Sequence, residues 1–383
     1  MKSRTLILII LSQFMCTSLW FAGNAVMPDL IINHGLEVGD LGLVTSSVQL
    51  GFIVGTLFYS FFTIADRYSP SRVFLVSSLL GATFNVLIVV EGLELSGILS
   101  LRFLTGFFLA GIYPVGMKIA SDYYEKGLGK AISLLVAALV VGTAFPHLVS
   151  SMGSDIDLKS VLYVTSLLAV FGGIIIWLFV PDGPYQKRGQ PTKFSILFQV
   201  FRNKKFKAAS FGYFGHMWEL YAFWAFVPVI LTSYNLSFNT ALNVPFYSFL
   251  VIGSGALACT LGGFLSGRFG EKKIATWALG LSGCCCLISP VLLQSAPVII
   301  VAFLIFWGWV VIVDSPLLSA LVAKHADSEI KGSALTISTS IGFAISILSI
   351  QLVNKLFTLI SFEYVFLVLT IGPVFGLIFL LKK

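Results

Sequence analysis

Charged side chains are scarce in this sequence of 383 residues. Asp, Glu, Lys and Arg together make up 11% of it, whereas a soluble domain carries roughly 25%. So few charges cannot cover a water-facing surface, which excludes an ordinary soluble globular protein. Hydrophobic residues make up 57%, and the mean hydropathy is +0.96. The composition therefore predicts an all-α polytopic membrane protein, whose helices need about 20 apolar residues each to span a bilayer.

The sequence also lacks metal-binding and nucleotide-binding patterns. Its five cysteines, Cys16, Cys259, Cys284, Cys285 and Cys286, have no metal-type spacing. We interpret them as small packing residues and expect no metal and no cofactor. The segment GLGKA at 127–131 lacks the ending of a phosphate loop, so ATP is not expected to be the direct energy source. The net charge of +7 must be judged by its distribution in a membrane protein, and we expect no nucleic-acid partner.

Hydropathy and helix-breaking residues predict twelve membrane-spanning helices. Their ranges are 5–28, 41–64, 72–91, 95–122, 130–151, 159–180, 208–233, 243–267, 273–293, 297–323, 332–355 and 361–381. The first is expected to remain uncleaved, because its apolar stretch continues through Met27 without a small-residue cleavage site. The connection 181–207 separates an N-terminal bundle (1–180) from a C-terminal bundle (208–383). Within that connection, FSILFQVF at 194–201 predicts a short amphipathic helix on the membrane surface.

The distribution of basic residues predicts the orientation. If the N-terminus is cytoplasmic, the inside loops hold 20 of the 24 Lys and Arg residues. Only Lys159 and Lys355 fall outside, while Arg102 and Lys118 lie within a span. Because cytoplasmic loops are enriched in Lys and Arg, we expect a cytoplasmic (inner) membrane protein with both termini in the cytoplasm.

The two halves of the sequence repeat each other at an offset of about 200 residues. Pro28 aligns with Pro228, and the loop ADRYSPSR at 65–72 aligns with SGRFGEKK at 266–273. In helices 4 and 10, Gly106 and Pro114 align with Gly308 and Pro316. Such a parallel repeat predicts two pseudo-symmetric six-helix bundles, an architecture typical of one large class of transporters.

These loops resemble a signature of the Major Facilitator Superfamily. GTLFYSFFTIADRYSPSR at 55–72 is similar to the family's loop between helices 2 and 3, although Ser69 replaces the usual glycine. GGFLSGRFGEKK at 262–273 is the second copy, and RFLTGFFLAGIYP at 102–114 is similar to the family's element in helix 4. The resemblance implies that loop charges act as a gate that favours the outward-facing state. The gating candidates are Asp66, Arg67, Arg72 and Arg268, and for basic loop residues the alternative is a role in topology alone.

Two further features bear on the subclass. YPVGMKIASDYY at 113–124 is similar to the anion and cyanate-permease branch of the same family. Helix 5 reads VVGTAFPHLV at 140–149 and lacks the GPxxGG run of drug–proton antiporters, which weakens a drug-exporter interpretation without removing it.

Ionisable residues at mid-membrane depth are the candidates for proton coupling. A charged side chain there costs roughly 2.5–3.5 kcal/mol or more, so such residues are rare and usually functional. Glu219 and Asp314 are predicted near the middle of helices 7 and 10, and Pro316 is expected to loosen the backbone beside Asp314. His216 lies on the same helix face as Glu219 and could tune the nearer of the two carboxylates. Alternatively, these carboxylates are structural and pair across helices.

A second set of residues lies at depths suited to substrate binding. Arg102 could bind an anionic substrate or brace helix 4 against helix 1 or 5. Asn24 is a lone amide in helix 1, where a cavity or an interhelical hydrogen bond is favoured over lipid. For the aromatic members, packing or lipid contact is the competing interpretation. The candidates are Arg102, Asn24, Trp20, Tyr113, Tyr221, Trp218 and Trp307.

The sequence therefore predicts a monomeric secondary transporter in the membrane lipid. Its partners would be protons and a small organic solute, with an anionic solute among the possibilities, moved by alternating access. Drug or metabolite efflux by proton antiport and uniport with structural carboxylates remain open. A remote alternative is an intramembrane enzyme that uses HMWE at 216–219, but we expect no catalytic residues.

Overall fold

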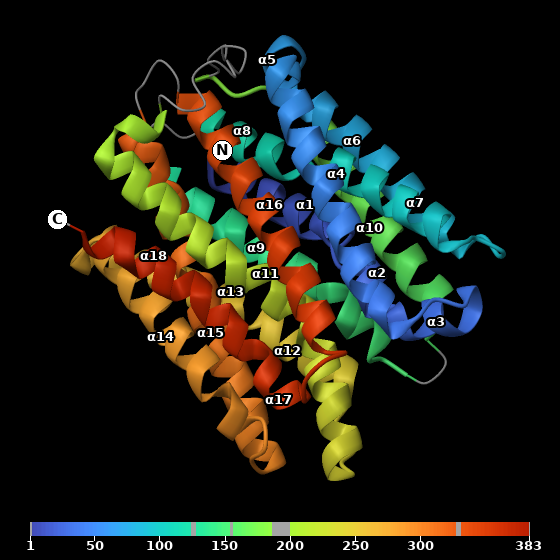
Figure 1. The fold of residues 1–383 in the computed structure, drawn as a ribbon. Helices are drawn as coiled ribbons and strands as arrows, with labels where there is room; N and C mark the ends of the chain where they lie inside the picture. Colours follow the sequence, from blue (N-terminus) through green and yellow to red (C-terminus); the bar gives the residue numbers. More distant parts are fainter. Residues whose placement is uncertain (1, 124–127, 154–155, 186–199, 327–330, 383) are drawn as a thin grey trace. The chain divides into compact units, whose positions relative to one another are not determined.

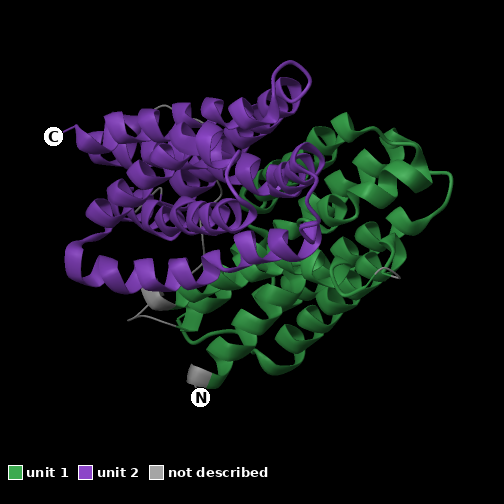
Figure 2. Cartoon of the chain, turned by 90° about the horizontal axis from the view of Figure 1, so that it is seen from below, with its two compact units in different colours: residues 1–192 green, residues 193–383 purple. Residues whose placement is uncertain are grey.

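The computed structural model describes residues 2–123, 128–153, 156–185, 200–326 and 331–382. Every regular element in these ranges is helical, so the predicted all-α fold is confirmed (Figure 1). The chain separates into two compact units, Met1–Thr192 and Lys193–Lys383 (Figure 2). Their boundary falls within the predicted connection 181–207. The predicted amphipathic helix at 194–201 lies outside the described residues except for its end, which belongs to the short 3₁₀ helix η4 (Val200–Arg202).

Unit 1 contains α1 (Lys2–Thr17), α2 (Ala22–Ala25), α3 (Met27–His34), η1 (Val38–Asp40), α4 (Leu41–Phe61), α5 (Ile64–Arg67), α6 (Pro70–Val86), η2 (Leu87–Val89), α7 (Leu95–Leu109), α8 (Tyr113–Tyr123), α9 (Leu128–Ser150) and α10 (Leu158–Phe179). Unit 2 contains η4, α11 (Lys204–Phe238), α12 (Val244–Gly253), α13 (Gly255–Phe269), α14 (Glu271–Leu292), α15 (Pro297–His325), α16 (Lys331–Leu356), α17 (Phe362–Val365), η5 (Phe366–Thr370) and α18 (Ile371–Leu381).

Within the described ranges, eleven helical segments are long and apolar enough to cross a membrane. They correspond to predicted helices 2 to 12. Predicted helix 1 differs, because its continuous apolar part covers only Arg4–Thr17. The prediction of an unbroken helix at 5–28 was wrong: α1 ends at Thr17, and a turn over 18–21 separates it from α2.

Polar groups lie at this interruption. The hydroxyls of Thr17 and Ser18 donate to the carbonyl oxygens of Gln13 and Met15, each at 2.7 Å. Such side-chain bonds to the preceding turn compete with the helical hydrogen bonds of the backbone. The carbonyls of the turn itself are bound by Arg102 from α7, as described below. A hydropathy pattern contains none of this tertiary information.

Helices 4 and 8 are also interrupted. Helix 4 is divided into α7 and α8 just before Pro114, whose ring would clash with the carbonyl one turn earlier in a continuous helix. Helix 8 is divided into α12 and α13 at Ser254, whose hydroxyl accepts a hydrogen bond from Nε1 of Trp309 at 2.9 Å. In contrast, α15 continues through Pro316, so the expected loosening beside Asp314 does not interrupt that helix.

The aligned glycines of the repeat make equivalent backbone contacts in the two units. A methyl group added to Gly106 of α7 would lie 1.9 Å from the carbonyl oxygen of Val48 in α4. A methyl group added to Gly308 of α15 would lie 2.2 Å from the carbonyl oxygen of Val251 in α12. Both distances are far below van der Waals contact, so only glycine allows these helices to approach so closely. Each unit thus packs its second helix directly against the backbone of its fourth.

Candidate functional site

Glu219 lies in the middle of α11 and is completely buried. Its Oε1 accepts three hydrogen bonds within unit 2. Nε1 of Trp307 in α15 donates at 2.7 Å, the thiol of Cys286 in α14 donates at 3.3 Å, and the hydroxyl of Ser282 donates as well. Ser282 and Cys286 are four residues apart, which places them on one face of α14. Three helices therefore converge on one carboxylate oxygen.

The second oxygen of Glu219 is in a different environment. Oε2 is buried and has no hydrogen-bond partner among the described residues. The indole of Trp307 stacks on Phe223 with ring centroids 4.5 Å apart, and Phe303 and Phe366 are its other ring neighbours. Burial disfavours the charged form of the carboxyl group, whereas the three donors favour it. Burial and the three donors therefore act on this carboxyl group in opposite directions.

His216 lies one turn before Glu219 on α11 and contacts the other predicted carboxylate. Its Nδ1 is 2.8 Å from Oδ1 of Asp314 in α15, and both side chains are 1% exposed. Of the two predicted carboxylates, the one that His216 pairs with is Asp314. An imidazole this close to a carboxylate forms an ion pair with it when the imidazole is protonated. Unit 2 thus buries two protonatable centres on successive turns of α11.

Arg102 is completely buried in unit 1, on α7. Its Nη1 donates to the carbonyl oxygen of Leu19 and to Oδ1 of Asn85, both at 3.2 Å, and its Nη2 donates to the carbonyl oxygen of Trp20. These carbonyls belong to the turn that interrupts helix 1. Asn85 is oriented in turn by Thr165 and Ser166 of α10, to whose hydroxyls its amide donates. In this structure Arg102 therefore braces helix 4 against helix 1.

The remaining substrate-binding candidates are divided between the units. Asn24 donates to the hydroxyl of Thr45 in α4 at 2.7 Å, which is an interhelical bond, and Trp20 packs against Phe52 with ring centroids 4.8 Å apart. Tyr113 begins α8 and is partly exposed.

In unit 2, Tyr221 packs against Trp224 and Phe343. Trp218 donates to the carbonyl oxygen of Val368 in η5 at 3.1 Å, so its indole points toward helix 12. Trp307 is the candidate that the structure brings together with Glu219.

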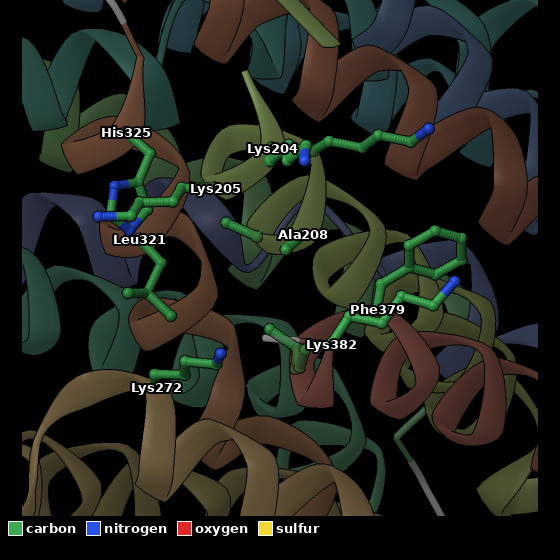
Figure 3. A pocket seen from close by; sticks show the side chains of 11 residues that line it. Lys204, Lys205, Ala208, Lys272, Leu321, His325, Phe379 and Lys382 are labelled. Atoms are coloured by element: carbon green, nitrogen blue, oxygen red, sulfur yellow. The ribbon is translucent and has the colours of Figure 1, made fainter. Parts of the chain in front are cut away.

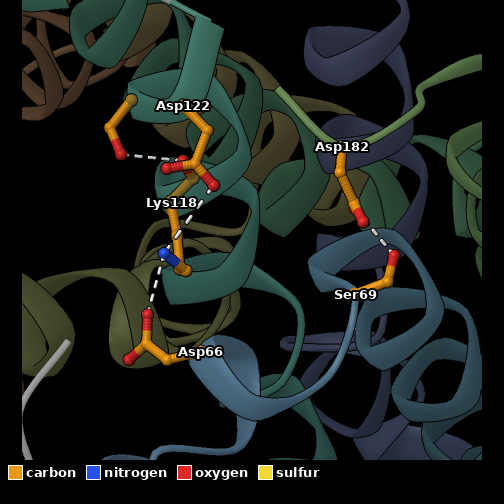
Figure 4. A network of polar contacts seen from close by, with 6 residues as sticks. Asp66, Ser69, Lys118, Asp122 and Asp182 are labelled. Atoms are coloured by element: carbon orange, nitrogen blue, oxygen red, sulfur yellow. Dashed lines mark hydrogen bonds and ion pairs between the residues drawn. The ribbon is translucent and has the colours of Figure 1, made fainter. Parts of the chain in front are cut away.

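The predicted gating residue Asp66 forms an ion pair within unit 1 (Figure 4). Nζ of Lys118 lies 2.9 Å from Oδ1 of Asp66 and 3.7 Å from Oδ2 of Asp122, so Lys118 contacts both carboxylates. Nearby, the hydroxyl of Ser69 donates to Oδ1 of Asp182 at 2.7 Å. These bonds connect the loop between helices 2 and 3 to the end of helix 4 and to the start of the connection.

The other gating candidates lie at helix ends. Nε of Arg67 donates to the hydroxyl of Thr63 at 3.1 Å. Arg72 is exposed in the first turn of α6, and the guanidinium of Arg268 lies 5.4 Å from the ring centroid of Phe269. The gating role of all four residues stays a prediction.

Sequence reasoning did not identify Ser282, Cys286 and Asn85 as site residues. Their signal is weak, because small polar residues hardly alter hydropathy, and only the four-residue spacing of Ser282 and Cys286 could have indicated a shared face. The interpretation of the cysteines as packing residues was incomplete: Cys286 bonds to Glu219, and Cys284 is exposed. Over the described ranges, no group of three His, Cys, Asp or Glu side chains could hold a metal ion.

Comparisons with known proteins agree with this architecture. The sequence profile of the Major Facilitator Superfamily matches residues 9–350. An uncharacterised protein of Campylobacter jejuni, Cj0987c, is 23% identical over 275 residues, which cover 70% of this chain and 82% of that protein.

Two solved transporter structures share the fold. The human organic anion transporter MFSD10 (TETRAN) superimposes with a TM-score of 0.78 at 14% identity, covering 99% of both chains. The nucleoside transporter NupG, as its D323A mutant, superimposes with a TM-score of 0.74 at 16% identity, covering 99% of this chain and 100% of the other.

Proposed function

Because the chain belongs to the Major Facilitator Superfamily, we propose that it couples the movement of a small organic solute to the movement of protons across a membrane. The chain is a multi-pass membrane transporter and not an enzyme. The observation that carries the proton coupling is the pair of buried protonatable centres in unit 2, Glu219 and His216–Asp314. Ionisable groups inside membrane spans are costly and mark ion or substrate pathways.

Glu219 is the primary proton carrier in this proposal. Trp307, Ser282 and Cys286 stabilise the carboxylate through Oε1, and Oε2 remains available to receive a proton. When the site opens to the side of higher proton concentration, Glu219 becomes neutral and the burial penalty falls. When the site opens to the other side, the proton leaves, and the three donors offset part of the free energy of burying the charged carboxylate. The alternation of access is a ligand-dependent shift between two states.

The solute is proposed to be a small organic molecule. The solved structures that share this fold are an organic anion transporter and a nucleoside transporter, and both kinds of solute are small organic molecules. Both terminal nitrogens of Arg102, the basic residue first considered for an anion, donate to protein oxygens. The proposal therefore does not commit to an anionic solute.

Transport in proteoliposomes under an imposed pH gradient tests the proposal. Small organic acids, amines and nucleosides are first screened by thermal shift for stabilisation of the purified protein. Uptake and efflux of a stabilising solute are then measured with and without the gradient. We expect the gradient to increase solute accumulation several-fold, and we expect Glu219→Gln and Asp314→Asn to remove that increase. Accumulation that ignores the gradient, or coupling unchanged in both variants, would reject the proton role.

Uniport is the second candidate, and one observation favours it. Oε1 of Glu219 already has three donors, and Asp314 already contacts His216, so both carboxylates could serve only to join helices. A uniporter would equilibrate the solute without accumulating it at any pH gradient. The same variants would then lower thermal stability without changing the final solute ratio.

A further inference from the structure

A basic cavity lies at the end of unit 2 where α11 begins and α15 and α18 end (Figure 3). Its volume is about 670 Å³. This end carries Lys-rich helix termini and is the one that the distribution of basic residues predicts to face the cytoplasm. The basic residues that line the cavity are Lys204, Lys205, Lys207, Lys272, His325 and Lys382.

The charges of this cavity are not neutralised by its own walls. None of the residues that line it is acidic. Glu271, next to Lys272 in the chain, instead lies 3.6 Å from Nζ of Lys324, which does not line the cavity. Five amino groups held around one space repel each other, and a bound anion would relieve that repulsion. The helix ends are fixed independently, because the amide of Asn203 at the start of α11 donates to the carbonyl oxygen of His325 at the end of α15.

The other walls of the cavity are apolar, which favours an amphiphile over a free inorganic anion. Ala208, Leu321, Phe379 and Leu380 are among its lining residues. Beside it, Phe379 packs on Phe211 with ring centroids 4.5 Å apart. The ammonium groups of Lys207 and Lys382 lie 5.4 Å and 5.0 Å from the ring centroids of Phe211 and Phe379, respectively. Long basic side chains that lie along aromatic rings are typical of a membrane–water boundary.

We propose that this lysine cavity binds the phosphate headgroup of an anionic phospholipid, with the acyl chains along the aromatic face of α11 and α18. That face continues to Phe375, which is 38% exposed and packs on both Phe211 and Phe379. Basic pockets between membrane helices on the cytoplasmic side recognise such headgroups by charge and hydrogen bonding. The proposal is independent of the solute and of proton coupling.

Native mass spectrometry of the purified full-length chain tests this site with phosphatidylglycerol and, separately, zwitterionic phosphatidylcholine. We expect phosphatidylglycerol to bind more tightly, and its affinity to fall with ionic strength. One lysine near an anionic lipid is worth about a fivefold change in affinity, so the double variant Lys205→Gln/Lys272→Gln should bind phosphatidylglycerol about 25-fold more weakly. The charge-retaining variant Lys205→Arg/Lys272→Arg should bind it almost normally.

The matched control is Arg4→Gln/Lys331→Gln, which removes two exposed charges outside the cavity and should leave lipid binding unchanged. Equal affinity for the two lipids, or equal weakening in the control and in the cavity variant, would overturn the proposal. Glycerophosphoglycerol, the headgroup without acyl chains, distinguishes the sources of phosphate. If it binds as tightly as the lipid, the cavity is a site for a soluble phosphate compound and the lipid assignment is wrong.

Discussion

At the scale of single residues, the hydrogen bonds of Glu219 separate its two oxygens. Oε1 has three donors, whereas Oε2 has none among the described residues. Each donor stabilises the charged carboxylate, so the strength of proton binding depends on side chains that carry no charge themselves. Among these donors, Trp307 is the one with an aromatic side chain, and Phe223 stacks on it. A phenylalanine substituted for Trp307 could keep this stacking while it loses the hydrogen bond.

Trp307→Phe keeps the ring stacking and removes one donor to Glu219. A hydrogen bond to a charged group is worth about 1.5–3 kcal/mol. Loss of this donor leaves the charged carboxylate of Glu219 less stabilised, so we expect proton-coupled transport to fall about tenfold or more, since each 1.4 kcal/mol is a factor of ten. Trp309→Phe is the control, because that indole donates to Ser254. Equal loss of coupled transport in both variants would contradict the role of Trp307.

At the scale of helices, Gly106 and Gly308 allow the same close approach of two helix backbones in the two units. Gly106→Ala and Gly308→Ala would place a methyl group 1.9 Å and 2.2 Å from a backbone carbonyl oxygen, and the helices would have to separate. We expect each variant to lower the melting temperature in detergent by several degrees. Gly280→Ala in α14 is the control: nothing lies within 4 Å of its added methyl group, and Ala is the better helix former. Unchanged melting of the first two variants would refute these contacts.

A helix start in unit 1 provides a prediction with a pH dependence. Oδ1 of Asp157 accepts hydrogen bonds from the backbone NH and the hydroxyl of Ser160, at 2.9 Å and 2.8 Å, and so caps α10. These bonds lower the pKa of Asp157 below its usual value. The stabilisation is therefore complete above about pH 4 and is lost as the pH falls through the lowered pKa. Asp157→Ala should destabilise the protein by about 1 kcal/mol at pH 7, whereas Asp157→Asn should largely retain the cap. Equal melting temperatures of the parent and Asp157→Ala at pH 7 would exclude this capping role.

The positions of most helices could be predicted from local sequence, whereas the interruption of helix 1 and the partners of the buried polar groups depend on tertiary contacts. Apolar runs located helices 2 to 12, for example 159–180 against Leu158–Phe179. The interruption of helix 1 could not be predicted, because it depends on Arg102 from another helix. The start of α11 at Lys204 was missed because its basic first turn lowers hydropathy. Glu219 and Asp314 were recognisable by their charge, whereas the hydroxyl of Ser282 and the thiol of Cys286 were not.

At the scale of the whole molecule, the orientation in the membrane stays a prediction. Lys159 at the start of α10 is predicted to lie outside, and Lys331 at the start of α16 is predicted to lie in the cytoplasm. With exposed Cys284 replaced by Ala, a membrane-impermeant maleimide applied to intact cells should label Lys159→Cys and not Lys331→Cys. Permeabilised cells, in which both variants should be labelled, are the control. If only Lys331→Cys were labelled in intact cells, the true orientation would be the reverse of the predicted one.

The glycine contacts have a mechanical consequence. Between α4 and α7, and again between α12 and α15, main chain touches main chain, so no intervening side chain can change rotamer to let one helix slide on the other. Each of these two helix pairs should therefore move as one rigid unit. In the proposed alternating access, the bending would therefore occur elsewhere, for example at the interrupted segments 18–21 and 110–112 of unit 1.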